Sequence, residues 1–327
     1  MPDRLPPRPP ADLSRVKTID IATRQSKVRP ELLARVPEPG VGLAGFLETL
    51  PDILKAADLR AVVEALAGAV RRRRAVVWMM GAHPIKCGLS PLLCEMIRRG
   101  WITTLCLNGA GAIHDFEIAN FGHTSEDVEA GLADGTFGMA RETAEGIFAA
   151  MRAGLEGSGL GAGAAIGQAI ARSGAPHRGL SLLAACAETS TPATVHIAVG
   201  TDIIHQQPSA DGALMGEASF RDFQLLAGQL ADLDDGGVVV NLGSAVLLPE
   251  VFLKALTVAR NLGHRVENFT AVNFDMIQHY RANMNVVSRP TRTGGGRGYS
   301  LTGHHEIMIP LVFAALQDAL ASADREP

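Results

Sequence analysis

The chain has 327 residues, of which 47% are hydrophobic and 20% are charged, and its formal net charge is -4. A chain of this length can bury a large core, and its slightly acidic balance argues against a dominant nucleic-acid-binding face. It has neither a run of about 18 apolar residues nor a signal-peptide pattern, so we expect a cytoplasmic protein that does not bind or cross a membrane.

Residues 1–42 are rich in proline, which predicts an extended N-terminal arm that lies on the body or on a neighbouring subunit. Residues 43–70 have the apolar spacing of helices and end in the arginines 71–74. These arginines favour a solvated helix C-terminus over a nucleic-acid site, because a helix C-terminus attracts positive charge. We find no linker after residue 42 and expect residues 43–327 to form a single domain.

Short apolar runs then alternate with amphipathic segments. The expected strands are 75–81, 102–109, 194–200, 236–243 and 268–274. The expected helices are 90–100, 124–135 (with a capping box of Thr124 and Asp127), 139–155, 217–233, 249–263 and 306–323. This alternation predicts an α/β, doubly wound, mostly parallel sheet of Rossmann-like type, with helices on both faces.

Glycine and polar residues follow each expected strand, where a parallel sheet binds its ligands. The pair Gly109 and Gly111 gives only part of a dinucleotide-binding fingerprint. The stretch 157–167 has more glycines but follows a helix, so it suggests a flexible joint or close helix packing. The stretch 291–299 is either an ordered anion-binding loop or a solvated mobile loop.

The metal and cysteine patterns are unremarkable. Neither the segment His304–Glu306 nor the pair Asp275 and His279 has the spacing of a zinc motif, so we expect no catalytic metal. The four cysteines form no C-x-x-C pair and indicate reduced core thiols rather than zinc ligands or disulfides: Cys87, Cys94, Cys106 and Cys186.

Several segments resemble deoxyhypusine synthase, in the same order along the chain. The stretch "VVWMMGAHPIKCGLSPLLCEMIRRGWITTLCLNGAGAIHDFEIA" is similar to the N-terminal part of that family, with residues 108–111 and Asp115 at the places of its Thr-Ala-Gly-Gly-x-Glu-Glu-Asp motif. "SADGALMGEASF" looks like its Asp-Gly-x-x-Gly-Asp loop, "VVVNLGSAV" is similar to its glycine-rich strand end, and "IMIPLVFAAL" to its C-terminal helix. The resemblance implies an NAD-binding Rossmann-like fold in a homo-oligomer, a dimer or tetramer, with active sites shared across a dimer interface.

The chemistry of that family is not fully matched. Its members carry an aminobutyl group as an imine on a lysine, and "GGGRGY" places Arg297 where that lysine stands. A guanidinium stays protonated and does not form this imine, so we do not predict deoxyhypusine synthesis itself. "NGAGAIHDFE" also resembles archaeal-type ornithine cyclodeaminases (the LOR/SDH-like domain). Those enzymes use bound NAD to oxidise an amino acid transiently, which requires no lysine nucleophile.

We therefore predict an NAD-dependent enzyme, of transferase or cyclodeaminase type, that acts on a small amine or amino acid by transient hydride transfer. The alternative is a non-catalytic, oligomeric nucleotide- or ligand-binding protein of the same fold. The expected cofactor-binding residues are Gly81, His83, Asn108, Gly109, Gly111, Asp211, Gly243, Ser244, Asp275 and His304. The expected catalytic residues are His114 for proton transfer, Asp115 and Glu217 for a substrate ammonium, and Lys86 and Arg297 for a carboxylate or the cofactor phosphates.

Overall fold

The computed structural model describes residues 7–323, which contain one six-stranded sheet in the order β3-β2-β1-β4-β5-β6. Every neighbouring pair of strands is parallel. The strands are β1 (Val76–Met80), β2 (Thr104–Asn108), β3 (Ala193–His196), β4 (Val238–Leu242), β5 (Thr270–Asp275) and β6 (Arg297–Thr302). The doubly wound parallel sheet is confirmed, and its strand order is that of dinucleotide-binding folds.

The helices fill the intervals between the strands. Before β1 lie α1 (Leu43–Thr49) and α2 (Leu54–Arg71), and between β1 and β2 lie α3 (His83–Lys86) and α4 (Ser90–Arg98). Between β2 and β3 lie α5 (Gly109–Phe121), α6 (Val128–Asp134), α7 (Arg141–Ser158), α8 (Ala162–Arg172) and α9 (Leu182–Thr189). The later helices are α10 (Gly212–Gln229), α11 (Leu247–Asn261), α12 (Tyr280–Ala282), the π-helical turn η7 (Asn283–Ser288) and α13 (His305–Ala323).

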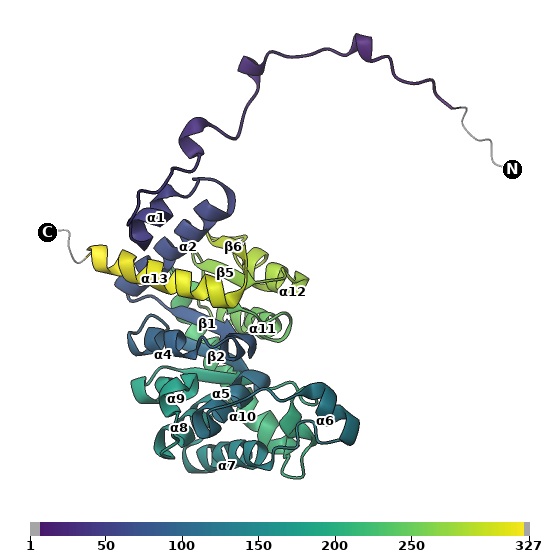
Figure 1. Cartoon of the computed structure of the whole chain (residues 1–327). Coiled ribbons are helices and arrows are strands. Elements are labelled where there is room, and N and C mark those ends of the chain that lie inside the picture. The colour runs from purple at the N-terminus through teal and green to yellow at the C-terminus, as the bar shows by residue number, and fades with distance from the viewer. Residues whose placement is uncertain (1–6, 324–327) are drawn as a thin grey trace.

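The strands are buried on both faces, which explains why they read as continuous apolar runs. Val76, Trp78 and Met80 of β1 belong to one core, which also contains residues of α2, α4, α9 and α13. Val77 and Met79 point to the opposite core, which is closed by the end of α10 and by α11. Figure 1 shows α2, α13, α4 and α9 following one another along the sheet.

Two glycine-rich stretches contain regular structure. β6 begins inside the stretch 291–299, at Arg297, and pairs with β5 from Thr270 onwards. The glycine-rich stretch 157–167 runs into α8, where glycine allows close packing: a Cβ on Gly163 would lie 2.3 Å from the Ala193 carbonyl oxygen. The second of the two readings of this stretch, close helix packing, is therefore the one the structure supports.

The described part of the N-terminal arm projects away from the body (Figure 1). Residues 7–31 are exposed, and the next residue, Leu32, is half-buried. Main-chain contact with the body begins where the Leu32 carbonyl accepts from Asp52 N at 2.9 Å and Arg35 N donates to the Thr49 carbonyl at 2.9 Å. Within the arm, residues 7–31 therefore form no main-chain hydrogen bond with the body, whereas Leu32 and Arg35 do. The placement of the arm on the body or on a neighbouring subunit stays a prediction.

All four cysteines are free thiols; Cys94, Cys106 and Cys186 are buried, whereas Cys87 is half-buried. Within residues 7–323, none of the helices has both the length and the apolar character needed to cross a bilayer. The same residues contain no group of three or more His, Cys, Asp or Glu side chains placed to hold a metal ion.

Candidate functional site

The helix α5 sets the geometry of the site, although its first half reads as a loop in the sequence. Asn108 ends β2 and caps α5, because its side-chain oxygen accepts from Gly111 N at 2.8 Å. The helix ends at Gly122, whose φ of 74° is the left-handed conformation typical of glycine at this position. Since residues three apart share one face of a helix, His114 and Glu117 lie together and the intervening Asp115 points elsewhere.

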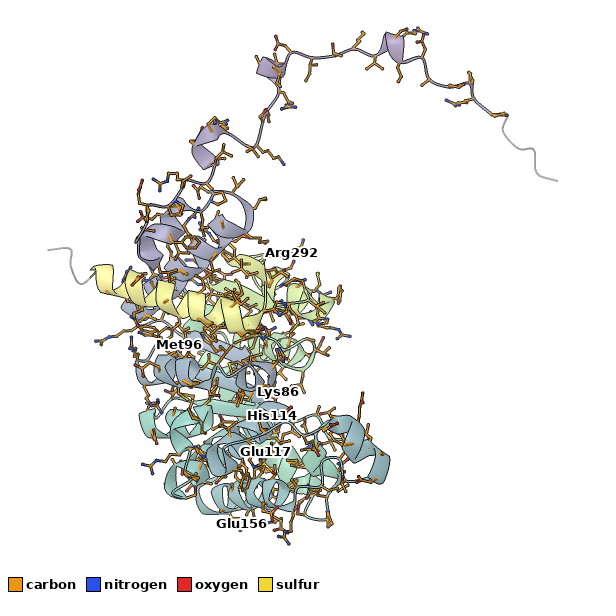
Figure 2. The ribbon with its side chains drawn as sticks, in the orientation of Figure 1. Lys86, Met96, His114, Glu117, Glu156 and Arg292 are labelled. Atoms are coloured by element: carbon orange, nitrogen blue, oxygen red, sulfur yellow. The ribbon has the colours of Figure 1, made fainter. Side chains whose placement is uncertain are left out.

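That shared face lines a cavity of about 530 Å³ at the carboxyl edge of the sheet. Its wall comes from α3, α5, the segment 123–143 and the loop after β3. The polar side chains in it are Lys86, His114, Glu117, His123, Thr124, Ser125, Glu126, Glu142, Thr143, Thr201 and Asp202. In Figure 2, Lys86, His114 and Glu117 lie one below another in this part of the molecule.

A hydrogen-bonded chain holds His114 in place. Its Nδ1 lies 2.5 Å from Thr124 Oγ1, and the Thr124 hydroxyl donates to one oxygen of Glu117. Thr143 Oγ1 donates to the other Glu117 oxygen at 2.9 Å. Because the single hydroxyl hydrogen of Thr124 goes to Glu117, the His114 Nδ1 carries a hydrogen and donates it, which leaves Nε2 as the nitrogen with the free lone pair.

This arrangement corrects the expected capping box. Thr124 does not cap α6; Asp127 does so alone, by accepting from Ala130 N at 3.1 Å. Thr124 is drawn instead to His114 and Glu117, which lie ten and seven residues before it.

Burial lowers the pKa of His114, and the nearby positive charge of Lys86 lowers it further, while Glu117 acts in the opposite direction. The imidazole is only 17% exposed. Its neutral form therefore dominates at neutral pH, and a neutral imidazole can accept a proton.

The cavity has an excess of negative charge. Four carboxylates line it, and among residues 7–323 Lys86 is the one Lys or Arg side chain in its wall. Of these carboxylates, Glu117 is held by two threonine hydroxyls, and both oxygens of Glu126 accept from Gly138 N at 3.0 and 3.1 Å. An excess of fixed carboxylates attracts a cationic ligand.

Asp202 occupies the N-terminus of α5. Its carboxylate accepts from Ala110 N, and a Cβ on Gly109 would lie only 2.0 Å from its Oδ2. Any side chain other than hydrogen at position 109 would therefore displace this carboxylate. Burial raises the pKa of Asp202, an effect that its hydrogen bonds and the neighbouring His205 only partly oppose.

A second polar region lies at the switch point of the sheet, between the ends of β1 and β4. The loops approach closely there, because a Cβ on Gly81 would lie 2.7 Å from the Gly243 carbonyl oxygen. The ring of His305 covers Gly243, whose φ is +65°, and a Cβ on Gly243 would lie 2.5 Å from that ring. Ser244 is buried beside it, accepting from Leu248 N at 3.2 Å.

Two buried polar atoms in this region have no hydrogen-bond partner: the side-chain oxygen of Asn241 and Nδ1 of His305. The Nε2 of His305 lies 3.3 Å from the Phe274 carbonyl, to which it donates, so Nδ1 is an acceptor. Burial lowers the pKa of His305, which keeps the ring neutral. Asp275, at the end of β5, is buried close to this histidine.

The short helix α3 connects the two regions. His83, at its start, has its ring 5.5 Å from the ring of His305 and its Nε2 3.3 Å from the thiol of Cys87. Lys86, at the end of α3, lines the cavity near His114. A ligand that spans both regions would pass over α3.

Three of the predicted catalytic residues, Asp115, Glu217 and Arg297, do not share one cavity with His114. Asp115 is fully buried on the other face of α5, where its carboxylate accepts from Ser181 Oγ, Leu182 N and Leu183 N. Its function is to cap α9, and its burial raises its pKa to about 6. Glu217 is exposed on α10 and pairs with Arg221 at 2.7 Å. Asp115 and Glu217, which were expected to hold a substrate ammonium, therefore do not lie in one cavity with His114.

Arg297 is the third of these residues, and it lies at the far edge of the sheet. It begins β6 and thus lies at the amino edge of the sheet, whereas the cavity lies at the carboxyl edge. Arg292 precedes it and lies apart from Lys86, His114 and Glu117 in Figure 2. Of the five predicted catalytic residues, the structure brings together only Lys86 and His114.

The predicted cofactor residues divide in a similar way. Gly81, His83, Gly243, Ser244 and Asp275 gather at the switch point. Asn108, Gly109 and Gly111 form the start of α5, where the cap and Asp202 already engage them. Asp211 caps α10 and pairs with Arg152, and His304 is 62% exposed. The adjacent His305, not His304, faces the switch point.

Lys86 and His114 aside, the polar side chains that line the cavity were not predicted as site residues; Glu117, Thr124, Thr143 and Asp202 are the four that the site geometry depends on most. The spacing of His114 and Glu117 would have indicated a shared face if 109–121 had been recognised as a helix. The two threonines and Asp202 join the site through tertiary folding, and no local pattern marks them.

Comparisons with known proteins bear on the fold. No protein-family model matches the chain, and neither does any curated protein sequence. A conserved protein of Methanococcus maripaludis S2, provisionally assigned as LOR/SDH, matches with a TM-score of 0.52 and 15% identity, over 82% of this chain and 71% of that chain.

AgrE, in a ternary complex with ornithine and NAD+, matches with a TM-score of 0.50 and 17% identity, over 84% of this chain and 35% of that chain. This chain thus spans about a third of the length of AgrE. A provisionally assigned deoxyhypusine synthase from Entamoeba histolytica has a TM-score of 0.48 and 8% identity, over 86% and 95% of the two chains. At these identities the likeness of the first two matches shows the fold alone.

Proposed function

We propose that the protein is an NAD-dependent enzyme that oxidises a small amine or amino acid by hydride transfer in the cavity between α3, α5 and the loop after β3. The observation that carries the proposal is the juxtaposition of a neutral, oriented imidazole, a single lysine and several carboxylates at the carboxyl edge of a dinucleotide-type sheet.

The charges of the cavity suit the substrate class. Fixed carboxylates such as Glu117 and Glu126 favour an ammonium group, and Lys86 favours the carboxylate of an amino acid. A volume of about 530 Å³ is enough for a small substrate together with one ring of a cofactor.

His114 supplies the base. Oxidation of an amine to an imine removes a hydride from carbon and a proton from nitrogen, and the unprotonated Nε2 of His114 is the acceptor that we assign to this proton. Thr124 and Glu117 act as positioning residues, because they fix the ring and favour the imidazolium that forms.

The switch point fits a nicotinamide cofactor. When bound, such a cofactor accepts the hydride. Gly81 and Gly243 allow the close backbone approach that a dinucleotide needs, and His83, Ser244 and Asp275 surround them. The unpartnered Nδ1 of His305 and the side-chain oxygen of Asn241 are acceptors that could receive hydrogen bonds from hydroxyl or amide groups of the cofactor.

We also infer a homo-oligomer from this edge of the sheet. Four apolar side chains that follow β4, β5 and β6 are more than half exposed: Val246, Ile277, Tyr280 and Ile307. Burial against a second copy would remove this apolar surface from water. Light scattering should give a mass above the 34.4 kDa of one chain, and Ile277→Lys should reduce it.

The decisive experiment measures two properties of the purified protein. NADH should bind, as followed by its fluorescence, and an added amino acid or amine should change the absorbance of the nicotinamide in the presence of NAD+. His114→Ala should retain cofactor binding and lose turnover, while His264→Ala, an exposed histidine at the opposite edge, should retain both. Absence of NAD(H) binding would contradict the proposal and favour a ligand-binding protein of another specificity.

A further inference from the structure

One end of the cavity contains a site that is filled by the chain's own carboxylate. Asp202 Oδ2 lies where a side chain on Gly109 would be, against the first turn of the 13-residue helix α5, and the carboxylate accepts from Ala110 N. A helix N-terminus presents free N–H groups and a partial positive charge, which favour an anion. The glycine at position 109 is what gives an anion access to this helix end.

A buried donor beside this carboxylate has no acceptor. His205 Nδ1 accepts from Gly200 N at 3.0 Å and from Asp202 N at 3.3 Å, so the ring hydrogen is on Nε2. That Nε2 has no hydrogen-bond partner, although the His205 side chain is only 5% exposed. It lies 3.8 Å from Asp202 Oδ2, which is too long for a hydrogen bond.

The site therefore offers more donors than Asp202 uses. A buried N–H without an acceptor costs free energy, and an anion placed slightly differently would contact both this N–H and the helix N-terminus. Lys86 lines the same cavity and adds a positive charge to it. The raised pKa of Asp202 is consistent with a carboxylate that is held there against its desolvation.

We propose that the N-terminus of α5 and the Nε2 of His205 form a subsite for a small oxyanion, a carboxylate or phosphate group of the ligand, which Asp202 occupies until the ligand displaces it. This subsite deepens the proposed function, because it assigns a place to the anionic group of the substrate or cofactor. The geometry that supports it does not depend on the redox step.

The test replaces Asp202 and supplies simple anions in the absence of any nucleotide. Acetate and inorganic phosphate are titrated separately into the wild-type protein and Asp202→Ala, with the thermal midpoint and the amide signal of Ala110 as readouts. We expect the half-saturating concentration of one anion to fall by about tenfold or more in the variant, since its competitor is gone. Tighter acetate indicates a substrate carboxylate, and tighter phosphate indicates a cofactor phosphate.

Two further variants make the result specific. Asp127→Ala removes the carboxylate that caps α6 outside the cavity and should behave like the wild type. Adding His205→Phe to Asp202→Ala should abolish the gain, because it removes the Nε2–H donor.

The proposal is overturned if folded Asp202→Ala gains affinity for neither anion, or if Asp127→Ala gains as much. If Asp202→Ala does not fold, the wild type decides the matter: at high acetate or phosphate the signals of Ala110 N and His205 Nε2 should shift together and saturate, and no shift would exclude the subsite. Because no nucleotide is present, a protein that fails to bind NADH can still pass this test, and the reverse also holds.

Discussion

The imidazole of His114 and the hydroxyl of Thr124 are joined by a hydrogen bond of 2.5 Å, although Thr124 lies beyond the end of the helix that carries the histidine. Thr124 in turn donates to Glu117. One hydroxyl therefore fixes the ring and links it to the negatively charged Glu117 carboxylate. A base whose tautomer and orientation are set in this way needs little reorganisation when it accepts a proton.

Replacing Thr124 should therefore lower turnover without unfolding the protein. Thr124→Val keeps the shape but loses the hydroxyl. We expect kcat to fall about 10-fold to 100-fold, less than the roughly 100-fold to 10,000-fold that a general base contributes in full, because His114 itself remains. Thr124→Ser restores the hydroxyl and should recover most of the rate. Thr257→Val, on the exposed face of α11, is the control and should be neutral. Equal losses in Thr124→Val and Thr124→Ser would show that the hydroxyl is not what matters.

The pKa of His114 should respond to its two charged neighbours in opposite directions. Glu117 raises this pKa and Lys86 lowers it, so Glu117→Gln should move the titration of His114 to lower pH and Lys86→Met should move it to higher pH. Because the base acts unprotonated, the acidic limb of kcat/KM should shift the same way in each variant.

Nuclear magnetic resonance of the histidine ring signals measures these shifts directly, with His114→Gln to assign the signal. The signals of the exposed His264 should be the same in all three proteins. A shift of the same sign in Glu117→Gln and Lys86→Met would show that the two side chains do not act on His114 through their charges.

The contact between Gly109 and Asp202 predicts a contrast between two glycine substitutions. Gly109→Ala places a Cβ 2.0 Å from the Asp202 carboxylate, which must then leave the start of α5, and we expect a loss of about 1–3 kcal/mol in the free energy of unfolding. Gly216→Ala, inside α10 with no atom within 4 Å of the added Cβ, should stabilise by about 0.5–1 kcal/mol. Urea unfolding of both variants checks this, and a neutral Gly109→Ala would mean that Asp202 is not tightly held.

Most of the fold could be predicted from the sequence, but the last strand, β6, and the helix α5 could not. Five strands are buried on both faces and read as apolar runs, which is why their positions were clear. β6 is an edge strand that is half exposed, and the glycines before Arg297 resemble a loop. In α5 the small residues after Asn108 also resemble a loop. They are helical because the Asn108 side chain accepts from Gly111 N and caps the helix.

The site was less predictable, because residues that are neighbours in the sequence can point to different sides of a helix. His114 and Asp115 are adjacent in sequence and were expected to act together, yet on a helix adjacent residues point about 100° apart. His304 and His305 illustrate the same limit: only the second faces the switch point. Asp202 and Thr124 reach the cavity from separate loops, which only the tertiary structure brings to α5.

The buried carboxyl of Asp222 should make stability depend on pH. Burial raises its pKa to about 7, although it accepts from Gly163 N and Val195 N, and the unfolded value is about 3.9. The folded state therefore binds the proton more tightly, so this contribution is complete below about pH 4 and is lost as pH rises to about 7. The change is a few kcal/mol at most.

Thermal midpoints measured across this range should fall with rising pH in the wild type and change less in Asp222→Asn, whose side chain does not titrate. The absolute stability of the variant should be lower in acid, because the amide introduces an N–H where the unpartnered oxygen of Asp222 lies. Asp232→Asn, an exposed position, should keep the wild-type slope. An unchanged slope in Asp222→Asn would assign the pH dependence to other groups, Asp115 first among them.

The N-terminal arm should be removable by limited proteolysis. Its basic residues Arg15, Lys17, Arg24 and Lys27 are exposed, and the backbone hydrogen bonds around them are local. Trypsin should therefore cut there before it cuts the body, whose first firm contact with the arm is at Leu32. The thermal midpoint of the trimmed protein should match that of the intact chain, because the arm covers none of its own core.

If the arm lies on a second copy, cleavage should slow as the protein concentration rises. A cleavage rate independent of concentration would argue against that contact. Early cuts within α2 would contradict the division at residue 42.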